Sequence, residues 1–160
     1  MRHGEVVSKN RNRQECHSSR IRPGGINHPG PFRNKRPTEP QRKTSRFPAE
    51  IKTFQISGIL TVIKKEEDED YHLVIVDQSD EDLTMIVESP NPNCAAGSRF
   101  LSQITDVRRA LDQKFGTFER EEPNVRVTVT GVAFFDRLHG QEGVASNGIE
   151  LHPILAIEFH

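Results

Sequence analysis

A single helical pattern interrupts a chain that otherwise alternates as β-strands. From residue 100 to 115, apolar side chains return every three or four positions, which predicts one amphipathic helix. Ser98 is its predicted N-cap, and Gly116 stands where a helix-ending glycine belongs. Three alternating segments precede this helix and two follow it. The predicted element order is therefore β-β-β-α-β-β.

The five predicted strands are Thr53–Lys64, Tyr71–Asp77, Leu83–Glu88, Val125–Phe135 and Ile149–Phe159. Short polar connections join the first three, as in an antiparallel meander. Gly58 and Gly131 fall inside strands, where glycines predict the sharp bends that let coiled strands close on themselves. The order predicts a mostly β fold, namely a five-stranded OB-fold-like Greek-key barrel with one helix between strands three and four. A β-sandwich would need more strands.

The charges of the chain are divided between two parts. Residues 1–47 hold twelve lysines and arginines against three glutamates, whereas the remainder holds ten basic and twenty acidic residues. We therefore predict a basic, Pro/Gly/Arg-rich disordered arm over residues 1–50 and a folded domain over residues 51–160. Three interpretations of the arm stay open. It contacts the phosphates of a nucleic acid, it is a solvated linker, or it folds back on the acidic domain.

Several classes of protein receive no support from the sequence. No apolar run has the length of a secretion signal or of a membrane span, so a cytoplasmic protein without membrane contact is expected. The two cysteines, Cys16 and Cys94, show no zinc-binding spacing, and Cys94 is interpreted as a small apolar residue. The motifs of serine hydrolases, P-loop enzymes and dinucleotide-binding folds are missing.

The predicted ligand site is the mouth of the barrel, between the loops that follow the first and fourth strands. These loops are the acidic Lys64–Asp70 and the glycine-rich Asp136–Gly148. A loop as long as the second is usually functional or disordered. The acidic loop would repel phosphate and suits a cation or a basic partner. The candidate ligand-binding residues are His72, Asp77, Glu88, Asp136, Arg137, His139 and Asn147.

A divalent metal ion is the predicted cofactor, if there is one. Glu150 and His152 are two residues apart on a strand and share a face, and His139 completes the predicted ligand set. Asp70 and His72 repeat the same relation on the second strand. The opposing interpretation is that His72 and His152 form hydrogen bonds across the barrel and that Glu150 is an ordinary outward-facing strand residue.

Three segments resemble a family of small uncharacterised bacterial proteins. They read EDEDYHLVIVD at residues 67–77, TMIVESPNPNC at 84–94 and GVAFFDRLHGQEGVASNGIELHP at 131–153. The resemblance covers residues 51–159 and implies membership without implying an activity. A more distant similarity is to staphylococcal-nuclease-like OB domains, which share the element order, and it implies that Asp77 is a calcium ligand. The chain departs from that family at His72, where the family has a catalytic arginine.

The sequence favours a non-catalytic OB-fold binding module that binds single-stranded DNA or RNA with help from the basic arm. One alternative is a metal-dependent, nuclease-like hydrolase with a His/Glu site at the barrel mouth. The other is an interaction scaffold whose acidic domain meets a basic protein.

Overall fold

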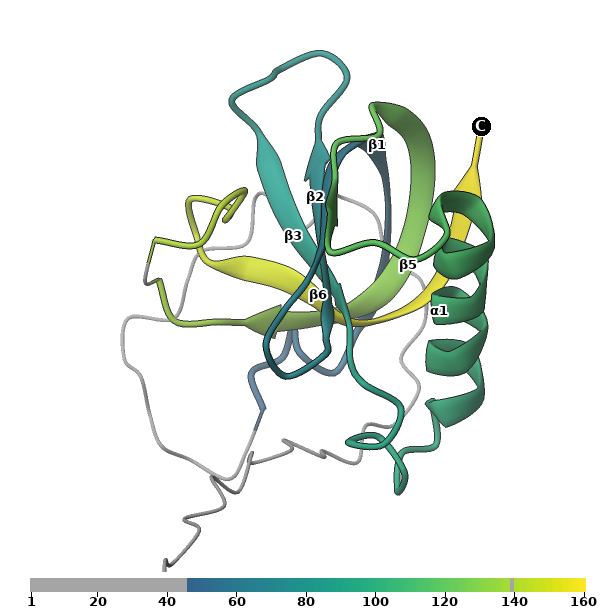
Figure 1. Ribbon diagram of the computed structural model, residues 1–160. Helices are drawn as coiled ribbons and strands as arrows, with labels where there is room; N and C mark the ends of the chain where they lie inside the picture. Colours follow the sequence, from purple (N-terminus) through teal and green to yellow (C-terminus); the bar gives the residue numbers. More distant parts are fainter. Residues whose placement is uncertain (1–45, 139) are drawn as a thin grey trace, which may run out of the picture.

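The computed structural model describes residues 46–138 and 140–160 (Figure 1). Of the disordered arm predicted over residues 1–50, residues 1–45 lie outside this part of the chain. The described residues form six strands and one helix. These are β1 (Thr53–Lys65), β2 (Tyr71–Val76), β3 (Thr84–Ser89), α1 (Leu101–Phe115), β4 (Arg120–Glu121), β5 (Val125–Phe135) and β6 (Ile149–Phe159).

Five of these strands close into a barrel. Antiparallel pairing links β1 to β2 and β5, β2 to β3, and β5 to β6. A parallel bridge between Val87 and Leu151 joins β3 to β6 and completes the ring. The predicted mostly β barrel, with its helix between the third and fourth barrel strands, is thereby confirmed. The two-residue β4 beside β1 was not predicted, because two residues carry no periodic pattern.

The core lies inside the barrel, and α1 covers it from one side. Strand alternation sends one row of side chains inward, and Leu60, Leu73 and Ile154 are fully excluded from solvent. The helix buries Ile104, Val107 and Leu111 and packs mainly against β6, beside which it stands in Figure 1. Among the described residues, no helix has the length and apolar character needed to cross a membrane.

The helix begins three residues after its predicted N-cap. The Oγ atom of Ser98 accepts the Phe100 N–H at 3.1 Å, so this serine belongs to the turn before the helix. Phe100 occupies the N-cap position and provides no side-chain hydrogen bond. The predicted cap is therefore wrong. The predicted end is confirmed, because Gly116 has φ 73° and donates its N–H to the Asp112 carbonyl.

A short segment before β1, which the sequence assigns to the arm, packs on the end of β5. The ring of Phe47 meets that of Phe135 edge-on at a centroid distance of 5.9 Å. Glu50 is buried, and its carboxylate accepts the backbone N–H groups of Phe47 at 2.7 Å and Phe135 at 3.1 Å. The folded unit therefore begins before Ile51.

Cys94 differs from its interpretation as an unmodified apolar residue. It is half-buried in the turn between β3 and α1, and it is disulfide-bonded.

The two glycines predicted to bend strands are places where another strand approaches closely. A Cβ atom on Gly58 would lie 2.5 Å from the carbonyl oxygen of Val76, and one on Gly131 would lie 2.8 Å from the Cβ of Leu151. The pairing register between β5 and β6 also shifts at Gly131. Glycine therefore permits the strand crossings that close the barrel.

We expect Gly58→Ala to destabilise the protein by about 1–3 kcal/mol, because the obstructing atom is a backbone oxygen in a paired strand and cannot rotate away. Thermal and urea unfolding of the full chain measure this loss. Gly97→Ala is the matched control, since a Cβ there meets nothing within 4 Å. Equal stabilities of the two variants would contradict the prediction.

Candidate metal centre

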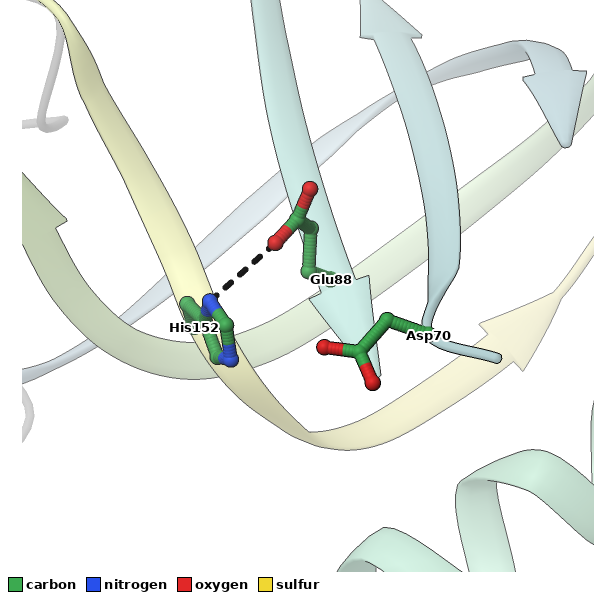
Figure 2. Close-up of side chains that lie close together, drawn as sticks. All are labelled: Asp70, Glu88 and His152. Carbon is green, nitrogen blue, oxygen red and sulfur yellow. Dashed lines mark ion pairs between the residues drawn. The ribbon is translucent and has the colours of Figure 1, made fainter. Parts of the chain in front are cut away.

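Three possible metal ligands from separate parts of the chain meet at one end of the barrel. Asp70 immediately precedes β2, Glu88 lies near the end of β3, and His152 lies on β6. One carboxylate oxygen from each acid and one imidazole nitrogen all lie within 4.8 Å of one another. Figure 2 shows the three side chains facing one another across the strand ends. We call this group the Asp70–Glu88–His152 triad.

Strand pairing, and not local sequence, assembles the triad. The parallel bridge between Val87 and Leu151 makes Glu88 and His152 neighbours on the outer face of the barrel. Asp70 is held against the end of β3 because its Oδ1 accepts the Asn91 N–H at 2.7 Å. Each ligand thus sits on an element that is fixed by the closure of the barrel.

Glu88 is the centre of the group. Its Oε1 lies 2.9 Å from Nδ1 of His72, and its Oε2 lies 3.1 Å from Nδ1 of His152. Burial raises the pKa of Glu88, but the hydrogen bonds and positive charges of His152 and His72 outweigh burial and lower the pKa to about 2. Glu88 is therefore ionised at neutral pH.

His152 contacts two acids at once. Its Nδ1 also lies 3.4 Å from Oε1 of Glu150, and its ring meets that of Phe134 at a centroid distance of 5.9 Å. Burial lowers the pKa of His152, but the hydrogen bonds and charges of Glu150 and Glu88 raise it to about 10. Without a metal ion, His152 therefore carries a proton that a metal ion would have to replace.

The other two acids at this end of the barrel, Glu150 and Asp70, have raised pKa values. Burial raises the pKa of Glu150 to about 7, and the charge of Glu88 adds to the effect. Burial also raises the pKa of Asp70. Carboxyl groups that bind protons readily around an ionised glutamate gain from a nearby cation, and such perturbed groups are typical of functional sites.

Arg108 of α1 contacts the backbone next to both acidic residues of the triad. Its guanidinium donates to the carbonyl oxygens of Ser89 and Glu69, both at 3.0 Å. These residues adjoin Glu88 and Asp70 in sequence. The guanidinium also lies over the ring of Tyr71, 3.5 Å from the centroid. The helix therefore fixes the spacing between the end of β3 and the loop before β2.

The predicted metal set is brought together only in part. His152 belongs to the triad, and Glu150 lies beside it as a hydrogen-bonding neighbour. His139 lies outside the described residues. The structure places Asp70 and Glu88, and not His139 and Glu150, in the triad with His152. Glu88 was predicted as a ligand-binding residue, whereas for Asp70 the sequence offered only its placement two residues before His72.

Other predicted residues lie away from the triad. Asp77 is at the opposite end of β2, and its Oδ1 accepts the N–H and hydroxyl of Ser79 at 2.8 and 2.7 Å. The calcium role that the nuclease resemblance implies for Asp77 stays a prediction, separate from the triad.

The remaining predicted residues shape the loop between β5 and β6. Asp136 and the carbonyl of Arg137 both accept from the side-chain amide of Gln141. Asn147 accepts the Ile149 N–H at 3.1 Å, and the side chain of Arg137 is exposed. These contacts explain Asp136 and Asn147 as residues that organise the loop.

The outer face of β2 and β3, next to the predicted barrel-mouth site, is covered by this same loop. The carbonyl oxygen of Glu142 lies 3.2 Å from Nε2 of His72, and that of Val144 lies 3.5 Å from the hydroxyl of Thr84. Val74, on the same face as His72, is 4% exposed. The triad at the strand ends is consequently the better-supported site.

Comparison of the chain with protein-family models, with curated proteins and with solved structures finds no match. The geometry of the triad is therefore the ground on which a function can be argued.

Proposed function

We propose that this protein is a divalent-cation-binding OB-fold domain whose ligands are Asp70, Glu88 and His152. The supporting observation is the convergence of two carboxylates and one imidazole, from three separate segments, within 4.8 Å. Ligand atoms about 2.1 Å from an ion are at most about 4.2 Å apart. Side-chain movements of less than about 1 Å would therefore bring the triad to coordination distance.

The mixed ligand set favours transition-metal ions. Imidazole suits Zn²⁺ and related ions, whereas Ca²⁺ takes six to eight oxygen ligands and Mg²⁺ requires near-ideal octahedral oxygen geometry. We expect Zn²⁺ to bind more tightly than Mn²⁺, and both more tightly than Ca²⁺ or Mg²⁺. Because the ion would replace the His152 proton, binding should release protons and weaken as the pH falls.

Ion binding is supported more directly than hydrolysis. Three protein ligands leave coordination positions for water, so a metal-dependent hydrolase stays an alternative. However, Arg108, the guanidinium that reaches the ligand-bearing segments, is committed to two backbone carbonyls and to the Tyr71 ring. It is therefore poorly placed to stabilise a phosphate.

Nucleic-acid binding by the basic arm is a separate hypothesis that falls outside the described residues. The acidic surroundings of the triad disfavour phosphate there, so such binding would depend on the arm and weaken steeply with salt. A basic protein partner is compatible with the same acidic surroundings.

Calorimetric titration of the metal-stripped full chain with ZnCl₂ and MnCl₂ tests the proposal. We expect one ion per chain, and we expect Asp70→Asn to weaken zinc binding by about 10-fold or more, since even outer partners of metal ligands contribute that much. Glu81→Gln removes an exposed charge at the opposite end of β2 and should bind zinc as the wild type does. A zinc affinity of Asp70→Asn equal to that of the wild type, or no zinc binding by the wild type, would overturn the proposal.

A further inference from the structure

His72 lies between the triad and the segment Gln141–Gly148. Its ring is on the outer face of β2, where the strand register sets it opposite Glu88, yet the residue is only 2% exposed. The cover comes from the segment Gln141–Gly148, which lies across the outer face of β2 and inserts Ala145 into the core. This burial is unusual for a polar residue on an outward-facing strand position.

The two ring nitrogens of His72 contact different structural units. Nδ1 lies 2.9 Å from Oε1 of Glu88, and Nε2 lies 3.2 Å from the backbone oxygen of Glu142. A carbonyl oxygen can only accept, so Nε2 donates to it. The segment therefore fixes the orientation of the ring, and the ring in turn holds one oxygen of a proposed ion ligand.

We propose that His72 is a positioning residue that couples ion binding at the triad to the placement of the segment Gln141–Gly148. This inference rests on the proposed function. With Oε1 of Glu88 held by His72, Oε2 is the oxygen that faces His152 and that would be left to bind an ion. Partners of this kind orient metal ligands and strengthen metal binding. Because coupling is reciprocal, ion binding must stabilise the segment as much as the docked segment favours the ion.

Gly143 allows the segment to be displaced without altering a ligand or His72. It has φ +78°, and a Cβ there would lie 2.4 Å from Cγ1 of Val74 on β2. Gly140 is the matched control, because it has φ +85° but a Cβ there meets nothing within 4 Å. Alanine causes backbone strain at both positions, whereas it pushes the segment away from β2 only at Gly143.

A second route loosens the segment from its exposed side. The guanidinium of Arg120 contacts the carboxylate of Glu142 at 2.9 and 3.0 Å, and its side chain is 43% exposed. Arg120→Gln removes this contact at the surface and leaves the core unchanged. It keeps the inference testable if Gly143→Ala does not fold.

The experiment uses the full chain and zinc alone, with affinity measured by calorimetry and with hydrogen exchange measured on peptides covering residues 141–148. Zinc should slow exchange in the wild-type segment. Gly143→Ala should weaken zinc binding by about 5-fold or more relative to Gly140→Ala, and Arg120→Gln should change it in the same direction. His72→Phe should weaken binding by about 10-fold and remove the zinc effect on exchange, whereas His72→Gln, which retains a donor, should restore part of both.

Two results would overturn the coupling while leaving the ion site intact. One is wild-type zinc binding with no change in exchange over residues 141–148. The other is equal zinc affinity in Gly143→Ala and Gly140→Ala, with Arg120→Gln also unchanged. Absence of zinc binding by the wild type would instead remove the proposed function itself.

Discussion

Replacing Glu88 with glutamine is expected to destabilise the metal-free protein by about 3–5 kcal/mol and to abolish zinc binding. Each oxygen of this carboxylate contacts an imidazole nitrogen, and the side chain is 20% exposed. Glutamine offers one acceptor oxygen and an NH₂ group, so one of the two histidines would face a second donor. The proton on His152 would also lose its nearest compensating charge. Urea unfolding and zinc titration measure the two effects.

Glu66→Gln is the control for the loss of a negative charge near His72. Its Oε1 is 3.8 Å from Nδ1 of His72, and its side chain is 39% exposed. We expect it to change stability by less than about 1 kcal/mol, because exposed ion pairs contribute little. If Glu88→Gln lost no more stability than Glu66→Gln, the hydrogen bonds of Glu88 would not contribute to the stability of the protein.

Without metal ions, the protein is expected to be most stable near pH 5 and to lose on the order of 3 kcal/mol towards pH 10. The pKa of His152 is raised to about 10 from its usual 6.5. Its contribution is therefore complete below pH 6.5 and is lost as the pH rises through 10. The pKa of Glu150 is raised to about 7 from 4.5, so its ionisation also costs stability as the pH rises through that range.

Glu88 controls the acid side of the same profile. Its pKa is lowered to about 2 from 4.5, so its contribution is present above pH 4.5 and is lost as the pH falls towards 2. Urea unfolding in EDTA at pH 3, 5, 7 and 9.5 measures both sides. His160→Gln alters an exposed histidine that contacts Thr128 and should keep the profile. A flat profile between pH 5 and 9.5 would contradict the prediction for His152 and Glu150.

Much of the fold could be predicted because its strands have strong alternation. Val125–Phe135 and Ile149–Phe159 were predicted with the bounds that the structure shows. The incorrect predictions concern positions about which helix and strand periodicity gives no information. Ser98 has a side chain typical of an N-cap, but it forms its hydrogen bond within the turn before the helix. The segment before β1 is held by a tertiary contact, the hydrogen bonds to the buried carboxylate of Glu50.

The candidate site could be predicted only as scattered residues. Glu88 and His152 were singled out for different reasons, and nothing local shows that they touch, because a parallel bridge between β3 and β6 brings them together. Asp70 is the last residue of the acidic loop Lys64–Asp70, in which the sequence does not distinguish one carboxylate from another. Asp77 was chosen from a resemblance, but the length of β2 separates it from the triad. The prediction for His139 remains a prediction.

The contact between Arg108 and Tyr71 places an intrinsic fluorophore beside the triad. The chain has one tyrosine and no tryptophan, so its tyrosine emission comes from Tyr71 alone. That ring directly follows Asp70, lies beneath the Arg108 guanidinium and donates its hydroxyl to Asp112 at 2.9 Å. An ion that draws in the Asp70 carboxylate must therefore disturb the surroundings of the single fluorophore. Tyrosine fluorescence of the unlabelled protein is therefore a direct test of whether zinc binds at the proposed site.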